Sequence, residues 1–180
     1  AQYVIEDLVD VPVRVDLASE FRYRKMPINK NSLVIVISQS GETADSLAAL
    51  RECKARGIRT LAIVNVIGSS IAREADNVMY TWAGPEIAVA TTKAYSTQLI
   101  AQYLLAMKFA KVRGTVSQND FDAMIQSLER LPEQISLLLS HKENVQRFAN
   151  RYLAAEHVFF IGRGIDYAIS MEGSLKLKEI

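Results

Sequence analysis

The residues best suited to chemistry form the stretch SQSGET at 38–43, which lies between an apolar, strand-like run and a helical pattern. Three hydroxyl groups, from Ser38, Ser40 and Thr43, can donate hydrogen bonds to phosphate oxygens, and Gly41 allows the backbone to approach a ligand closely. A helix that begins near Thr43 adds free backbone N–H groups and the positive end of its dipole. Neutral donors without lysine favour a phosphomonoester that is bound for recognition and not transferred.

The same stretch has a simpler interpretation as a helix N-cap with a glutamate in the first turn, because serine-rich turns often precede helices. Nucleotide-binding motifs do not compete with either interpretation. The sequence has neither a G-x-x-x-x-G-K-[ST] loop nor a G-x-G-x-x-G that follows a strand. It also has no His/Cys/Asp/Glu cluster with metal-ligand spacing, so we predict neither a metal nor a cofactor.

A second group of charged residues lies near the end of the chain. Lys176 and Glu179 are spaced i, i+3 and Glu172 and Lys176 are spaced i, i+4, so on a helix all three share one face. A carboxylate beside an ammonium group can move a carbon-bound proton and stabilise the charge that develops. From spacing alone, however, a surface ladder of salt bridges is the favoured interpretation of these residues.

The pattern of elements around the serine-rich turn predicts an α/β protein. Apolar, β-rich runs at 33–37, 58–66 and 77–82 alternate with helical patterns at 44–57 and 69–76, as in βαβ units of a doubly wound parallel sheet with helices on both faces. Residues 1–12 read as an amphipathic helix that Pro12 stops, and 13–21 alternate like a strand. In such sheets, ligands bind outside the carboxyl ends of the strands, where SQSGET falls.

The second half of the chain is predicted to be mainly helical. One long helix is expected from Glu86 to about Lys111, ended by Gly114, and further helix from about Gln118 to Ala155 with an interruption near Pro132. HVFFIGRG at 157–164 then returns to the strand-then-glycine pattern, and 166–180 resume a helix.

Composition excludes several classes of function. Apolar residues make up 49% and charged residues 23% of the 180 residues, as in ordinary globular proteins. A net charge of +1 gives no reason to expect nucleic acid or a membrane surface as a partner. No apolar run reaches the length of a transmembrane helix, and the first residues lack the basic-then-apolar pattern of a signal peptide. The single cysteine, Cys53, rules out an internal disulfide and favours a reducing, cytoplasmic location.

Four segments in this order carry a family resemblance: ASEFRYR at 18–24, SQSGET followed by ADSLAAL at 38–50, EIAVATTKAY at 86–95, and EGSLKLKEI at 172–180. Together they resemble the isomerase half of the glucosamine-6-phosphate synthase family, which is built from flavodoxin-like sugar isomerase (SIS) domains. A serine-rich loop alone is common to SIS domains, whereas the combination is more specific. The resemblance covers nearly the whole chain.

The resemblance implies roles for the candidate residues. Ser38, Gln39, Ser40 and Thr43 would bind the phosphate of fructose 6-phosphate, and Val89 would contact the sugar through its backbone. Glu179 would be the base that moves a proton between C1 and C2, Lys176 would lie beside these carbons, and Glu172 would belong to the same catalytic helix. The product would be glucosamine 6-phosphate for amino-sugar synthesis, made with ammonia from a glutaminase domain in the same protein, and the family implies a homodimer.

The resemblance also predicts a division of the chain and its relation to a longer protein. Residues 1–114 would form a first SIS unit without its first strand, 115–155 a helical connection, and 156–180 the start of a second unit. The first strand would precede Ala1, and a ring-opening histidine and an imine-forming lysine would follow Ile180, so we expect phosphosugar binding without turnover. In one hypothesis, HVFFIGRG fills the place of the missing first strand. In the other, which we favour, the chain is an excerpt of a longer polypeptide.

Two other functions remain compatible with the sequence. The chain could belong to another phosphosugar isomerase or deglycase with two SIS units. It could also be a non-catalytic SIS sensor that binds a phosphosugar and regulates a partner. A sensor would not need the pair Lys176 and Glu179, so their presence favours an enzyme.

Overall fold

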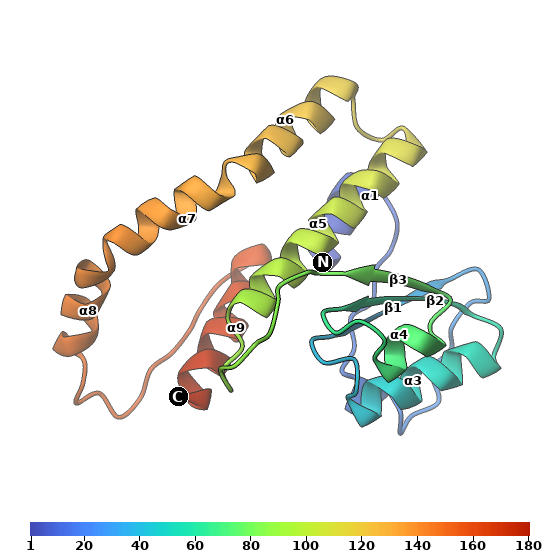
Figure 1. The fold of residues 1–180 in the computed structure, drawn as a ribbon, viewed down its shortest axis with the longest axis horizontal. Coiled ribbons are helices and arrows are strands. Elements are labelled where there is room, and N and C mark those ends of the chain that lie inside the picture. Colours follow the sequence, from blue (N-terminus) through green and yellow to red (C-terminus); the bar gives the residue numbers. More distant parts are fainter. The chain divides into compact units, whose positions relative to one another are not determined.

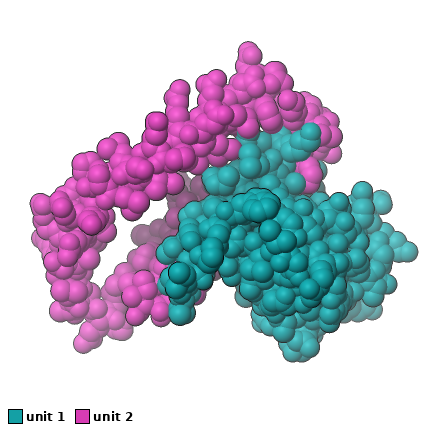
Figure 2. Space-filling view, in the orientation of Figure 1, with its two compact units in different colours: residues 1–108 teal, residues 109–180 magenta.

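The computed structural model describes residues 1–180, which divide into two compact units at 1–108 and 109–180 (Figure 2). Unit 1 contains a parallel sheet and its helices, and unit 2 is helical. The predicted division into 1–114, 115–155 and 156–180 is a different partition and stays a prediction. The elements, drawn in Figure 1, are α1 (Gln2–Val9), α2 (Ala18–Phe21), β1 (Leu33–Ser38), α3 (Ala44–Ala55), β2 (Arg59–Val64), α4 (Ser70–Glu74), β3 (Asn77–Tyr80), α5 (Lys93–Arg113), α6 (Gln118–Glu129), α7 (Leu131–Ser140), α8 (Lys142–Arg151) and α9 (Ile165–Glu179).

The sheet of unit 1 has three parallel strands in the order β1-β2-β3, so the predicted α/β architecture is confirmed. Leu33 pairs with Arg59 and Ser38 with Val64, while Leu61 pairs with Asn77 and Val64 with Tyr80. All three strands therefore run in the same direction, and their carboxyl ends lie at one edge of the sheet. The residues that follow these ends are the ones that build the candidate site.

The core of unit 1 lies on both faces of β2. On one face, Ala62 and Val64 pack with Leu50 of α3 and Ile71 of α4, and all four side chains are buried. Ile63 points to the opposite face and is also fully buried. Figure 1 shows α3 and α4 on one side of the sheet and α1 with the first part of α5 on the other. This layering is the doubly wound arrangement expected from the uninterrupted apolar runs.

A left-handed glycine, Gly57, follows the C-cap of helix α3. Gly57 has φ +71°, its N–H donates to the carbonyl of Lys54 at 2.9 Å, and the N–H of Ile58 donates to the carbonyl of Cys53 at 3.0 Å. These two bonds form a Schellman motif, and Cys53 and Ile58 pack in the same apolar cluster. Burial raises the pKa of the Cys53 thiol, in keeping with an inert core residue.

Three predicted elements differ from the structure. Residues 13–21 form no strand. In 13–17 the N–H of Val13 instead donates to the Glu6 carboxylate at 3.0 Å, and 18–21 form helix α2. Residues 157–162 likewise form no strand, so HVFFIGRG does not fill a place in the sheet. Alternating apolar residues favour a strand, but a strand needs a neighbour to pair with its backbone groups, and neither segment has one.

The third difference concerns the start of the long helix, which begins at Lys93 and not at Glu86. Residues 81–92 form a loop after β3 that contains Pro85 and several β-branched residues, which are weak helix formers. The predicted end at Gly114 is confirmed, with φ +73° at that residue. The interruption near Pro132 is also confirmed, as a break between α6 and α7 at Arg130.

In unit 2, residues 157–162 pack along α9. Phe160 lies against Gly173, where an added Cβ would be 3.0 Å from the phenyl ring, and the Ser170 hydroxyl donates to the carbonyl of Ile161 at 3.0 Å. Helix α9 confirms the helix predicted for the end of the chain. No helix of the structure combines the length and the apolar character needed to cross a bilayer.

Candidate functional site

The predicted phosphate-binding residues are brought together in one tight turn between β1 and α3. Ser38 is the last residue of β1 and is buried, Gln39 and Ser40 are half-buried, and Thr43 is exposed as the N-cap of α3. The Ser38 hydroxyl accepts the N–H of Gly41 at 3.0 Å and lies 3.1 Å from the Thr43 hydroxyl. These contacts close the turn. Ser38 holds it from its buried side, while Ser40 and Thr43 lie on its accessible side.

The start of α3 keeps its backbone donors available. The Thr43 side chain makes no capping hydrogen bond, because its hydroxyl is turned toward Ser38. The N–H groups of the first turn are therefore not used by a cap and can donate to an anion. Asp45 in this first turn would oppose a phosphate, but Arg22 pairs with it at 3.0 Å and offsets its charge. The Thr43 side chain thus does not make the hydrogen bond that the simpler N-cap interpretation requires.

Gly41 is required in the turn for two reasons. Its φ of +68° lies in the left-handed region, and an added Cβ would be 2.1 Å from the Ser69 hydroxyl oxygen and 2.6 Å from the Ser69 Cβ. Ser69 is buried, and its hydroxyl has no hydrogen-bond partner in the structure. The turn after β1 is thus packed directly on the residue that precedes α4.

Glu42 fixes the turn to α4 through a hydrogen bond. Its carboxylate accepts the N–H of Ser70 at 2.8 Å, and the N–H of Ile71 donates to the carbonyl of Gly41 at 3.0 Å. Hydrogen bonds from Ser70, through its side chain and its backbone, hold the pKa of the Glu42 carboxyl below its ordinary value. The expected helix at 69–76 therefore has a second use, because its first turn supports the candidate phosphate site.

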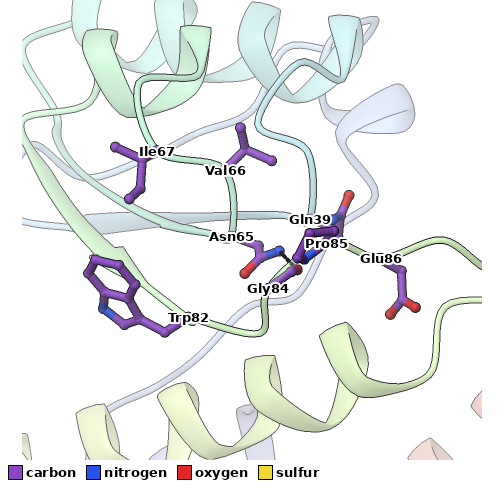
Figure 3. A pocket seen from close by; sticks show the side chains of 8 residues that line it. All are labelled: Gln39, Asn65, Val66, Ile67, Trp82, Gly84, Pro85 and Glu86. Carbon is purple, nitrogen blue, oxygen red and sulfur yellow. Dashed lines mark hydrogen bonds between the residues drawn. The ribbon is translucent and has the colours of Figure 1, made fainter.

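A groove of about 530 Å³ opens beside the turn at the carboxyl edge of the sheet (Figure 3). It shares Gln39 with the turn and is otherwise lined by Asn65, Val66, Ile67, Trp82, Gly84, Pro85 and Glu86. These residues follow the ends of β1, β2 and β3, which is where ligands bind in open parallel sheets. Val89 lies further along the same loop and is 93% exposed, so the structure does not place it among the groove residues.

Glu86 was given no role from the sequence, and the structure shows one. Its carboxylate accepts the N–H of Ala94 at 3.1 Å and the N–H of Thr92 at 3.4 Å, so it caps the start of α5 from within the preceding loop. Asn65 was also missed, although it follows β2 just as Gln39 follows β1. Asn65 could have been found from its position as a polar residue directly after a buried strand, whereas nothing in the local sequence indicated that Glu86 caps a helix.

The three charged residues predicted near the end of the chain share one face of α9 in unit 2. The Lys176 ammonium lies 2.6 Å from a Glu179 carboxylate oxygen and 3.4 Å from a Glu172 oxygen. The bond to Glu179, more than the charge of Glu172, raises the pKa of Lys176. While the carboxylates are ionised, the contribution of the Lys176 charge to stability is therefore fully present below the ordinary pKa of lysine and is lost as the pH rises through the raised value.

Arg22 and Arg24 of the ASEFRYR segment both pair with acidic side chains. Arg22 contacts Asp45, and Arg24 contacts Asp16. These arginines hold residues 16–24 near the start of α3, and neither of them lines the groove.

Taken together, the candidate site is a hydroxyl-rich turn beside a groove at the carboxyl ends of the strands of an open parallel α/β sheet, which is where ligands bind in this class of fold. The sequence pattern of the SIS domain family matches residues 1–108, and the chain belongs to this family. The matched range coincides with unit 1, which contains the turn and the groove.

Comparisons with known proteins extend the similarity beyond unit 1. The chain is 59% identical over 179 residues to a glutamine–fructose-6-phosphate aminotransferase (isomerizing) of Caldanaerobacter subterraneus subsp. tengcongensis, and 55% identical to that of Clostridium acetobutylicum. Each alignment covers 99% of this chain and 29% of the relative, so the chain spans less than a third of these proteins. The C-terminal domain of glucosamine-fructose-6-phosphate aminotransferase from Francisella tularensis superposes with a TM-score of 0.96 at 38% identity, over 99% of this chain and 51% of that one.

Proposed function

We propose that the chain is the sugar isomerase portion of an enzyme that converts fructose 6-phosphate and glutamine-derived ammonia into glucosamine 6-phosphate. The observation that carries the proposal is the closed Ser38–Thr43 turn, which gathers three hydroxyl groups in front of the uncapped backbone N–H groups of α3, a set of donors that suits a phosphomonoester. The 59% identity to an isomerizing glutamine–fructose-6-phosphate aminotransferase supports this choice of substrate. The glutaminase domain and the second subunit of a homodimer belong to the same proposal, as does a cytoplasmic location.

In this proposal the turn binds the phosphate and the loop after β3 contacts the sugar. Ser40 and Thr43 donate hydroxyl hydrogen bonds, Gln39 reaches the ligand from the shared edge of the groove, and Ser38 keeps the turn closed. The backbone of Val89, in the exposed part of the loop, contacts the sugar. The phosphate fixes one end of the substrate, and this orientation reduces the entropy that the chemical step must overcome.

The residues of α9 supply the chemistry. An imine of the ketose becomes an amine of the aldose when one base removes a proton from C1 and returns it to C2. Glu179 acts as this base, and the Lys176 ammonium stabilises the enolamine-like intermediate. Glu172 orients Lys176 from the other side, as their 3.4 Å contact allows. A non-catalytic sensor has no use for this arrangement of charges.

The binding part of the proposal is tested by calorimetric titration of the chain with fructose 6-phosphate and with fructose. Thr43→Val removes one hydroxyl without a change of shape, and Ser40→Ala removes another; Ser127→Ala, on an exposed site of α6, is the control. We expect saturable binding of the phosphorylated sugar only, weakened roughly tenfold by the double variant and unchanged in the control. Equal binding of fructose, or no effect of the double variant, contradicts the assignment of the turn.

The catalytic part is tested in the enzyme that contains this chain. Glu179→Gln keeps a hydrogen-bond acceptor beside Lys176 but removes the base, so kcat should fall by roughly a hundredfold or more while KM for fructose 6-phosphate changes little. An enzyme with Glu179→Gln that retains its kcat would exclude this residue as the base. A deglycase or a different phosphosugar isomerase would be recognised by products other than glucosamine 6-phosphate.

A further inference from the structure

Asn65 occupies a special position in unit 1, because it is the first residue after the central strand β2. Its backbone N–H donates to the carbonyl of Gln39 at 3.1 Å, which connects it to the candidate phosphate turn. Its side chain points the other way, into the loop after β3, and lines the groove (Figure 3). One residue therefore contacts both of the segments that the proposed substrate would touch.

The side chain of Asn65 makes three hydrogen bonds to the loop. Its amide nitrogen donates to the carbonyl of Gly84 at 2.7 Å, while its amide oxygen accepts the N–H of Ala83 at 2.8 Å and the hydroxyl of Thr81 at 3.1 Å. Both polar atoms of the amide are used. Such a pattern requires asparagine, since no other side chain of this length both donates and accepts in the plane of one amide group.

These three bonds surround a strained residue. Trp82, between Thr81 and Ala83, has φ +55°, a left-handed conformation that a bulky side chain rarely adopts. A residue keeps such a conformation when the surrounding contacts hold it, and strained residues of this kind concentrate at ligand sites. The bonds of Asn65 on both sides of Trp82 provide that restraint.

The other end of the loop is fixed separately, by the bonds from Glu86 to the start of α5. The loop is thus fixed at its beginning by Asn65 and further along by Glu86, with the exposed Val89 between Glu86 and α5. The phosphate turn has its own support from Ser38 and Glu42, which does not involve the Asn65 side chain. Loss of the Asn65 amide should therefore release the loop and leave the turn intact.

We propose that Asn65 is a positioning residue that holds the 81–92 loop at a fixed distance from the phosphate turn, so that phosphate and sugar of one ligand are bound together. This inference rests on the proposed function, because it assumes that the turn binds the phosphate of a sugar phosphate. It predicts that Asn65 acts on the sugar part of binding and not on the phosphate part.

The test compares two ligands, fructose 6-phosphate and inorganic phosphate, in calorimetric titrations of the chain. Asn65→Ala should weaken fructose 6-phosphate binding roughly tenfold and change phosphate binding by less than about twofold. Asn65→Asp retains the acceptor for Ala83 and Thr81 but loses the donor to Gly84, so it should restore part of the sugar-phosphate affinity. Equal loss for both ligands, or no loss for either, overturns the proposal.

A matched control separates positioning from a general loss of stability. Thr60→Val removes side-chain hydrogen bonds at the opposite end of β2, where the Thr60 hydroxyl donates to Asp76 at 2.8 Å and accepts its N–H at 3.1 Å. This variant should also be less stable but should keep the ratio of the two dissociation constants. A ratio that shifts as much in Thr60→Val as in Asn65→Ala would assign the effect to stability and overturn the proposal.

A readout without ligand keeps the proposal testable if the proposed function is wrong. The amide of Ala83 donates directly to Asn65, so its hydrogen exchange should become roughly tenfold faster in Asn65→Ala and change little in Thr60→Val. Unchanged exchange at Ala83 overturns the positioning role whatever the binding results are. If the unmodified chain binds neither ligand while Ala83 exchange responds, the proposed function fails and the loop contact alone is established.

Discussion

Replacement of Gly41 by alanine should be among the most damaging single changes in the turn between β1 and α3. Alanine at φ +68° costs about 1–2 kcal/mol in backbone conformation. Its Cβ would lie 2.1 Å from the Ser69 hydroxyl oxygen and 2.6 Å from the Ser69 Cβ, an overlap that must move backbone or side chain. Overpacking of this kind typically costs about 1–3 kcal/mol. The free energy of unfolding should therefore fall by about 2–5 kcal/mol.

Gly57 provides a matched control, because it has a similar φ of +71° and no atom within 4 Å of an added Cβ. Gly57→Ala carries the same backbone cost and the same gain from a less flexible unfolded chain. The difference between the two variants therefore isolates the contact with Ser69, and we expect about 1–3 kcal/mol. Urea unfolding followed by the fluorescence of Trp82, the only tryptophan, reports on unit 1.

A double variant then tests the physical cause. Ser69→Gly removes both of the atoms that the new Cβ would overlap and leaves only an ordinary contact with Val64 at 3.5 Å, so in that background Gly41→Ala should cost no more than Gly57→Ala does. The reasoning is refuted if Gly41→Ala and Gly57→Ala are equally destabilising in the unmodified chain. It is also refuted if the extra cost persists after Ser69 has become glycine.

Three further results are expected. Hydrogen bonds, first from Lys54 and then from Thr60, lower the pKa of Asp76 from its ordinary value of 3.8 to about 2. The ionised carboxylate therefore stabilises the fold fully above pH 3.8, and this stabilisation is lost as the pH falls through about 2. Between pH ~5 and ~2 the free energy of unfolding should therefore depend less steeply on pH in Asp76→Asn than in the unmodified chain, and equal slopes would argue against the shift. Glu86→Ala should cost about 1 kcal/mol and accelerate hydrogen exchange at Ala94, because the start of α5 loses its cap; an unchanged rate would show that this cap is dispensable. Glu179→Gln should lower the pKa of Lys176 toward its ordinary value in an NMR titration, whereas an unchanged pKa would mean that the pair does not form in solution.

Local sequence was sufficient for the elements that contain their own signals. The apolar run of β2 is buried on both faces, and Gly57 ends α3 in a Schellman motif, because chain-local periodicity and a left-handed glycine specify these features. The serine-rich turn between β1 and α3 could also be predicted, because its serines and its glycine lie between a strand-like run and a helical pattern in the sequence. For the same reason the charged face of α9 could be predicted, because i, i+3 and i, i+4 spacings are fixed by the helix.

The tertiary structure decided what depends on a neighbour far away in the chain. Residues 13–17 and HVFFIGRG have the composition of strands, but a strand forms only where another strand pairs with it, and that partner is not encoded within the segment. The start of α5 depends on Glu86, whose carboxylate reaches eight residues forward, and the 81–92 loop depends on Asn65 at the end of another strand. Sequence determined which local conformations were available, while long-range hydrogen bonds and burial selected among them, because these interactions exist only after distant segments have met.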